Sequence, residues 1–201
     1  MKVYFDSIGC RLNQSEIESL AHQFRAAGHE IVDSPGLADM VVVNTCSVTS
    51  EAASDSRQKI RQARRAGAEQ IIVTGCWATL EPEQAVELPG VTRVVMNSEK
   101  ERLAEVVLQV PPEVFDLEPL ERQPLPGIHQ RTRGFIKAQD GCDNFCTFCI
   151  TRLARGRGQS KPVEKILADI QFARRGGAQE VVLSGVHLGS WGNDQEPKKH
   201  L

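Results

Sequence analysis

The chain has 201 residues, of which 40% are hydrophobic and 25% are charged, and its formal net charge is −2 at pH 7. This length suits one large or two small globular domains, and this composition excludes an intrinsically disordered chain. No apolar run approaches the roughly 20 residues of a membrane span, and the first residues lack the pattern of a secretory signal. We therefore expect a cytoplasmic protein without a membrane partner.

Residues 1–110 alternate strand and helix patterns, which predicts an α/β domain with a doubly wound parallel sheet. Apolar, β-branched runs predict strands at residues 2–8, 29–32, 40–45, 70–74 and 93–96. Amphipathic segments predict helices at residues 13–27 and 51–66, a short helix beginning at Pro82, and a helix that ends at Leu108. For this last helix, Ser98 and Glu101 form a capping-box pattern.

Residues 111–128 differ from the segments on either side. Five of the ten prolines lie between Val110 and Pro126, together with several acidic residues. Such a composition predicts a semi-extended linker between two domains.

Residues 129–201 predict a second α/β unit, with strands at 135–139 and 180–185, a loop at 141–160 and a helix at 162–175. A sheet of two strands is not stable alone. We therefore expect this unit to be the incomplete beginning of a larger domain, and the chain by itself to show no turnover. The helix residues expected to face inward are apolar: Val163, Ile166, Leu167, Ile170 and Ala173.

Three cysteines of the first domain share one position relative to the predicted strands. Cys10, Cys46 and Cys76 each lie at or just past the carboxyl end of a strand and before a helix. Because the carboxyl ends of parallel strands meet at one edge of a sheet, we expect these strand-end cysteines to converge as ligands of a metal cluster. The alternative is that each is a small buried hydrophobic residue. Disulfides are disfavoured because the chain carries no export signal.

The other three cysteines, Cys142, Cys146 and Cys149, form a C-x3-C-x2-C motif within the expected loop. Three thiolates on a four-iron cubane leave one iron without a protein ligand, and that iron can bind a substrate or cofactor. The alternative for these loop cysteines is structural zinc, which usually takes four ligands in paired arrangements.

The loop-cysteine motif, with Phe148 before its last cysteine, resembles that of the radical S-adenosylmethionine superfamily. The resemblance implies that the open iron binds the amino and carboxylate groups of S-adenosylmethionine. Reduction then splits this cofactor into methionine and a 5′-deoxyadenosyl radical. It also implies that Phe148 packs near the adenine, and that Ser184 and Gly185 approach the amino acid end of the cofactor.

Nearly the whole chain is similar to the methylthiotransferases, in which an α/β domain with three strand-end cysteines precedes a radical S-adenosylmethionine (β/α) barrel. This resemblance implies two [4Fe-4S] clusters, S-adenosylmethionine, and an electron donor such as flavodoxin or ferredoxin. The loop cysteines would hold the cluster that generates the radical. The strand-end cysteines would hold the cluster that carries the sulfur to be inserted.

Four short segments most resemble the branch that acts on N6-threonylcarbamoyladenosine (position 37) in the anticodon loop of tRNA: residues 9–14, 141–146, 154–157 and 185–189. The implied product is the 2-methylthio derivative. Two sister branches remain as alternatives, one acting on isopentenyladenosine in tRNA and one on an aspartate of a ribosomal protein. An alternative from another class is a non-catalytic iron–sulfur electron-transfer or redox-sensing protein.

Basic residues are concentrated in two segments that suit contacts with tRNA phosphates. Residues 131–161 hold seven basic side chains against two acidic ones, and residues 57–65 form a second basic run. The alternative for the second run is a solvated helix face. For Arg155 and Arg157, which lie beside the loop cysteines, we expect contact with substrate or cofactor.

Overall fold

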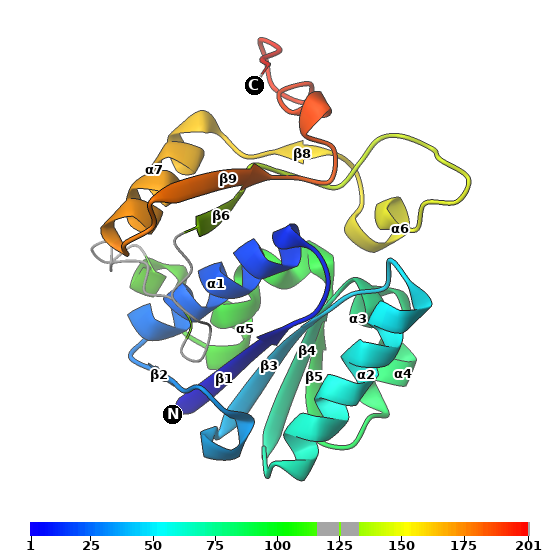
Figure 1. Ribbon diagram of the computed structural model, residues 1–201, viewed down its shortest axis with the longest axis vertical. Helices are drawn as coiled ribbons and strands as arrows, with labels where there is room; N and C mark the ends of the chain where they lie inside the picture. Colours follow the sequence, from blue (N-terminus) through cyan, green and yellow to red (C-terminus); the bar gives the residue numbers. More distant parts are fainter. Residues whose placement is uncertain (116–124, 126–132, 201) are drawn as a thin grey trace.

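The computed structural model describes residues 1–115, 125 and 133–200, which form two α/β units, one above the other (Figure 1). The first unit is built on a five-stranded, wholly parallel sheet in the order β2-β1-β3-β4-β5. Its strands are β1 (Lys2–Ser7), β2 (Glu30–Ile31), β3 (Met40–Thr45), β4 (Gln70–Gly75) and β5 (Val91–Val95), with the 3-10 helix η1 (Pro35–Leu37) between β2 and β3. These strands start and end within two residues of the expected positions, and the central strand β3 is buried at every residue.

Helices cover both faces of this sheet, which confirms the predicted α/β domain with a parallel sheet. On one face lie α1 (Arg11–Ala26) and α5 (Leu103–Leu108); on the other lie α2 (Ser50–Arg65), α3 (Cys76–Leu80) and α4 (Pro82–Val86). Phe24 and Leu103 fill the core on the first face, and Ile60 and Trp77 fill it on the second. No helix of the described residues is long and apolar enough to cross a membrane.

The capping box expected at Ser98 and Glu101 is wrong. Asn97–Arg102 forms a 3-10 helix, η2, that begins after Met96 and has no side-chain cap. In this conformation Lys100 points inward and pairs with the buried carboxylate of Glu16 on α1. A tertiary ion pair therefore shapes this segment in place of the local capping pattern.

The second unit contains one parallel βαβ arrangement. Strands β6 (Arg133–Lys137) and β9 (Glu180–Ser184) pair in parallel. Helix α7 (Val163–Arg175) lies between them in sequence and packs against them. The remaining elements are the antiparallel pair β7 (Gln139–Asp140) and β8 (Gln159–Ser160), the short helix α6 (Thr151–Arg155) and the 3-10 helix η4 (Leu188–Ser190). Its core contains Ile136, Ile166, Ala173 and Trp191.

One residue of the expected inward face of α7 points elsewhere. Leu167 is 52% exposed, whereas its neighbour Ile166 is 5% exposed. Successive helix residues are rotated by about 100°. The narrow two-stranded sheet therefore covers the strip that contains Ile166 and leaves Leu167 outside it.

Part of the segment expected to form the linker packs on the first unit. Pro112–Phe115 forms the 3-10 helix η3, and Phe115 and the buried Leu125 contact the core beside α1 and α5. Residues 116–124 and 126–132, which include Arg131 and most of the proline-rich segment, lie outside the described residues.

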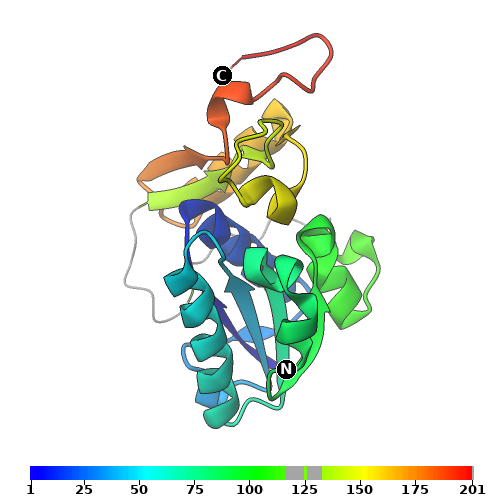
Figure 2. The same ribbon diagram turned by 90° about the vertical axis from the view of Figure 1, so that its right-hand side faces the viewer.

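The second unit lies over α1 and over the edge where the strands of the first sheet end (Figures 1 and 2). Strand β6 runs beside α1, and the backbone N–H of Lys137 donates to the Ser15 hydroxyl at 3.0 Å. Helix α6 packs against α3. Asn97, the first residue of η2, donates its Nδ2 to the carbonyl of Ala154 on α6 at 2.7 Å. These contacts bring the segment after the loop cysteines next to the edge that carries the strand-end cysteines.

Candidate metal centres

The structure brings the three strand-end cysteines to one edge of the first sheet. Cys10 follows β1 and is the N-cap residue of α1, Cys46 follows β3, and Cys76 follows β4 as the first residue of α3. Since β1, β3 and β4 are adjacent in the sheet, residues 36 and 30 positions apart in sequence become neighbours. Cys46 and Cys76 are buried, and Cys10 is exposed.

A glycine makes the close approach of two of these cysteines possible. Gly9 has a φ of +101°, and a Cβ built on it would lie 2.5 Å from Cys46 Sγ. The turn before Cys10 therefore rests directly against Cys46. Burial raises the pKa of the Cys46 thiol, and the nearby sulfur atoms of Cys76 and Cys10 act in the same direction. The three sulfur atoms thus share one electrostatic environment.

The donor set of this site consists of three cysteines. Among the described residues, no three Cys, His, Asp or Glu side chains are arranged around one metal position. In a four-iron cluster each thiolate binds its own iron, so the sulfur atoms need not converge on one point. Three soft thiolates at a sheet edge, with Cys10 exposed and Cys46 and Cys76 below it, fit such a cluster.

Two asparagines approach the sulfur atoms of this site. Asn13 Oδ1 lies 3.8 Å from Cys10 Sγ, and its Nδ2 donates to the carbonyls of Ile8 and Thr45 at 2.8 and 3.0 Å. Asn97 Nδ2 lies 3.8 Å from Cys76 Sγ. The sequence does not single out Asn97, because it lies directly before the predicted helix start at Ser98.

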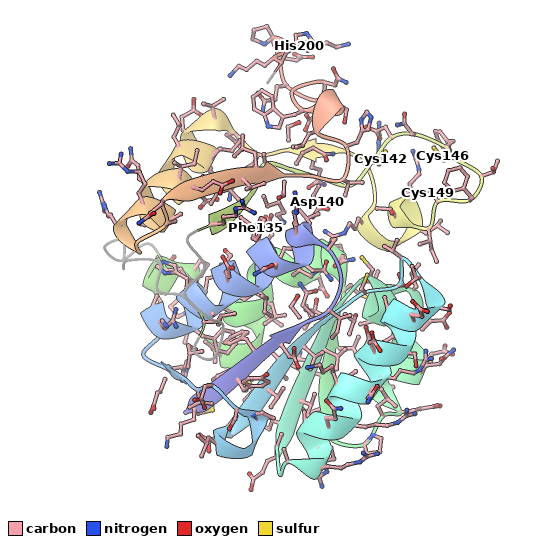
Figure 3. All side chains as sticks on the ribbon, viewed as in Figure 1. Phe135, Asp140, Cys142, Cys146, Cys149 and His200 are labelled. Atoms are coloured by element: carbon pink, nitrogen blue, oxygen red, sulfur yellow. The ribbon has the colours of Figure 1, made fainter. Side chains whose placement is uncertain are left out.

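The loop cysteines lie on a segment that extends from the second unit above α6 (Figure 3). Cys146 and Cys149 are exposed and Cys142 is half-buried, and the N–H of Cys149 donates to the carbonyl of Cys146 at 3.1 Å. Hydrogen bonds from the side chain and backbone of Thr151 lower the pKa of the Cys149 thiol. The loop therefore presents its thiols outward, one of them with a stabilised thiolate.

Tight backbone contacts hold the base of this loop. Gly141 has a φ of +63°, and a Cβ there would lie 1.9 Å from the carbonyl oxygen of Arg157, so only glycine fits. The N–H of Cys142 donates to the carbonyl of Gly156 at 3.1 Å. Arg152 lies over the ring of Phe145, 3.7 Å from its centroid. The first and last residues of the loop are thereby joined.

The three residues expected near a cofactor occupy different environments. Phe148 is 91% exposed on the loop. Ser184 is buried at the end of β9, and its hydroxyl has no hydrogen-bond partner within the described part of the chain. Gly185 lies against Gln139, where a Cβ would come within 3.0 Å.

Gln139, which sequence reasoning did not single out as a site residue, ties the loop cysteines to the end of β9. Its side chain is buried; Nε2 donates to the carbonyls of Asp140 and Gly141 at 2.7 Å, and Oε1 accepts from the N–H of His187 at 2.8 Å. One amide thus fixes the start of the cysteine loop and the loop that follows Ser184 and Gly185. No sequence pattern marks this role.

A buried group of ions joins the two units. Glu16 on α1 pairs with Lys100 at 2.8 Å, Arg155 at 2.9 Å and Lys137 at 3.6 Å, and Arg155 also pairs with Asp140 at 2.9 Å. We call these five residues the Glu16 cluster. Burial opposes the charge on Glu16, but Lys100, Arg155 and Lys137 outweigh it and hold the pKa of Glu16 well below its usual range.

Arg155, for which the sequence predicts contact with substrate or cofactor, is buried among residues of the chain. Its side chain is 3% exposed and fully engaged with Glu16, Asp140 and Asn13. Burial opposes the charge of Arg155, yet the carboxylates of Glu16 and Asp140 raise its pKa. Arg157, by contrast, is 84% exposed and pairs with Asp143 of the cysteine loop.

Several other basic side chains expected to meet phosphates are paired within the chain. These pairs are Arg133 with Glu180, Lys161 with Asp169 and Lys59 with Asp6, and Arg57 lies over the ring of Trp77. Arg61 and Arg65 are exposed on α2. The basic surface open to a phosphate is therefore smaller than the composition suggested.

A cavity of about 410 Å³ lies between α1 and the second unit. Ser15 and Ser19 line it from α1, Lys165 and Asp169 line it from α7, and Lys100 forms part of its wall. No cysteine is among the described residues that line it. The cavity is therefore separate from both cysteine sites.

Comparison with known proteins shows what this chain is similar to. Residues 2–97 match the family described as "Uncharacterized protein family UPF0004". A threonylcarbamoyladenosine tRNA methylthiotransferase of Bacillus subtilis is 36% identical over 204 residues, which cover 96% of this chain and 45% of that protein. The proteins of the same name from Aquifex aeolicus and Chlamydia pneumoniae are 36% and 37% identical, over 97% and 92% of this chain and 50% and 43% of their own lengths.

Over nearly its whole length, the chain is similar to part of these proteins, which are named methylthiotransferases. It spans about half the length of the curated relatives it matches. The matched segment of residues 2–97 contains all three strand-end cysteines, and the loop cysteines lie beyond it.

Proposed function

We propose that this chain belongs to the methylthiotransferase family and takes part in converting N6-threonylcarbamoyladenosine (position 37) of tRNA to its 2-methylthio derivative, with two [4Fe-4S] clusters and S-adenosylmethionine as cofactors. The substrate is the one in the names of the relatives. The observation that carries the proposal is that six cysteines form two separate groups of three, one at a sheet edge and one in a loop. We further propose three parts: a domain of residues 1–110, a linker of residues 111–128, and the first βαβ portion of a barrel from residue 129 to 201.

The loop cysteines would hold the first cluster. A cluster bound by three thiolates supplies an open iron that can bind S-adenosylmethionine and an electron for its cleavage. The exposed Cys146 and Cys149 can take up iron without rearrangement of a core, and Thr151 supports the thiolate of Cys149. Phe148 is free to pack on the adenine of the cofactor.

Ser184 and Gly185 are suited to receive the amino acid end of S-adenosylmethionine. The unpartnered Ser184 hydroxyl can hydrogen-bond a polar group, and Gly185 leaves room beside Gln139. Gln139 would keep this position and the loop cysteines at a fixed separation through its bonds to Gly141 and His187.

The strand-end cysteines Cys10, Cys46 and Cys76 would hold the second cluster, which provides the sulfur. A donor such as flavodoxin or ferredoxin would supply electrons to both clusters. For the tRNA, the anticodon loop suits this chemistry because its bases need little unstacking. Arg61 and Arg65, which are exposed on α2, are candidates for phosphate contacts.

The first test is the iron content after anaerobic reconstitution. We expect about eight irons per chain, because each set of three cysteines would assemble a four-iron cluster. A variant with Cys142, Cys146 and Cys149 changed to Ala should keep about half of this iron, and so should the variant with the strand-end cysteines changed to Ala. Each variant is the control for the other, since both have the same number of substitutions. Purification with zinc in place of iron would refute the cluster assignment.

The substrate is tested by deleting the gene that encodes this chain. Mass spectrometry of tRNA nucleosides should then show loss of 2-methylthio-N6-threonylcarbamoyladenosine and accumulation of N6-threonylcarbamoyladenosine. Restoring the gene provides the control. An unchanged level of this nucleoside, with loss of the methylthio group from isopentenyladenosine or from a ribosomal protein, would assign a sister activity instead.

A further inference from the structure

The buried ions of the Glu16 cluster do not balance. Three cations, Lys100, Lys137 and Arg155, face only two carboxylates, Glu16 and Asp140. Glu101 also contacts Lys137, but its side chain is 82% exposed, so water screens this charge. An uncompensated buried charge is costly, which raises the question of which anion completes the group.

The unbalanced charge lies beside the strand-end cysteines. Lys100 Nζ donates to Asn44 Oδ1 at 3.1 Å, and Asn44 lies two residues before Cys46. Arg155 Nη2 donates to Asn13 Oδ1 at 2.5 Å, and the same oxygen lies 3.8 Å from Cys10 Sγ. The bridge from Cys76 Sγ through Asn97 to the carbonyl of Ala154 reaches the residue before Arg155. These contacts make the strand-end cysteine site the candidate for the missing anion.

We propose that Lys100 and Arg155 are positioning residues for an anionic, thiolate-bound iron–sulfur cluster at Cys10, Cys46 and Cys76, and that loading this site strengthens the docking of α6 on the first unit. The inference rests on the proposed function, which supplies the cluster. A four-iron cluster with three thiolate ligands carries a net negative charge and supplies the missing anion. Arg155 belongs to α6 of the second unit, so its attraction to the cluster acts across the contact between the units.

The coupling is reciprocal. If the cluster strengthens the docking of α6, then the docked α6 must strengthen binding of the cluster by the same factor. Because α6 directly follows the loop cysteines, this coupling links cluster loading at the strand-end cysteines to the position of the loop cysteines. The Glu16 cluster would thus hold the two cysteine sites in a fixed relative position.

The test is hydrogen exchange measured by mass spectrometry, with and without reconstituted iron. The protein carries Ala at all three loop cysteines, so that only the strand-end site is loaded. We expect the amides of residues 139–156 to exchange about tenfold more slowly after loading, a coupling within the usual range. In an Arg155→Gln variant this difference should disappear. Arg152→Gln, on the same helix but outside the Glu16 cluster, is the matched control and should retain it.

A second readout distinguishes charge from packing. Arg155→Gln should lower the reduction potential of the loaded cluster, because a nearby cation stabilises its more negative reduced form. Arg155→Lys keeps the charge and should leave the potential close to that of the parent. A potential lowered equally by Lys and Gln would overturn the proposal, as would equal exchange rates in the apo and loaded proteins. Failure to bind iron at all would instead refute the proposed function.

Discussion

A Glu16→Gln variant should lose about 3–5 kcal/mol of unfolding free energy, which is the cost of removing one partner from a buried ion group. Gln has the size of Glu but no charge. The substitution leaves Lys100, Arg155 and Lys137 with Asp140 as their single largely buried counter-charge. We expect the contact between the two units to weaken most, because Glu16 lies on α1 whereas Arg155 and Lys137 lie in the second unit.

The measurement is urea unfolding followed by tryptophan fluorescence. Trp77 is buried in the core of the first unit and Trp191 in that of the second, so a Trp77→Phe background reports the second unit alone. Glu18→Gln, on the same helix but outside the Glu16 cluster, is the matched control. A loss of less than 1 kcal/mol in Glu16→Gln would show that the cluster contributes little to stability.

The destabilisation caused by Glu16→Gln should depend on pH. The pKa of Glu16 in the folded protein lies below the ordinary value of 4.5, so its stabilisation is fully present at neutral pH. It is lost as the pH falls below 4.5 toward the lowered pKa. The difference in unfolding free energy between parent and Glu16→Gln should therefore narrow under acidic conditions, and a constant difference would contradict this assignment.

The second large effect is expected at Gly75, which precedes Cys76 and pairs with Thr45, the residue before Cys46. Gly75 has a φ of +99°, and a Cβ there would lie 2.3 Å from the carbonyl oxygen of Thr45. With a ψ of −173°, Gly75 has a backbone conformation that is essentially restricted to glycine, so Gly75→Ala should cost about 1–3 kcal/mol for the backbone and about 1–3 kcal/mol more for overpacking. Because β3 and β4 would have to separate, Cys46 and Cys76 would move apart.

Gly67 provides a control with a similar φ. Its φ is +102°, but no atom lies within 4 Å of a Cβ built there. Gly67→Ala should therefore show the backbone cost alone and keep both iron sites. Gly75→Ala should keep the iron of the loop cysteines and lose that of the strand-end cysteines. Equal stability and equal iron content in the two variants would show that the contact with Thr45 is relieved without consequence.

The parts that sequence could predict depend on local pattern. The run from Met40 to Val43 has the composition of a strand buried on both faces, and it forms one. The position of Cys10, Cys46 and Cys76 after strands placed them at one edge because parallel strands with helical connections all end on the same side. For these cysteines, their positions after predicted strands were enough to predict where the sheet places them.

The parts that could not be predicted depend on distant partners. Glu16 and Arg155 are 139 residues apart, and Glu16 and Lys100 are 84 residues apart. A single sequence contains no signal for such pairs, and the flanking glycines made Arg155 resemble a ligand-binding residue. The Ser98 and Glu101 pattern failed for the same reason, since the inward turn of Lys100 outweighs a local cap worth about 1 kcal/mol.

The two cysteine groups differ in how far apart their members lie along the chain, and this sets the order in which they can mature. Only three and two residues lie between the loop cysteines, so an unfolded chain already holds them close together. The strand-end cysteines come together only after β1, β3 and β4 have paired. If the proposed clusters form, delivery of iron to the sheet edge would have to follow folding, whereas delivery to the loop could precede it.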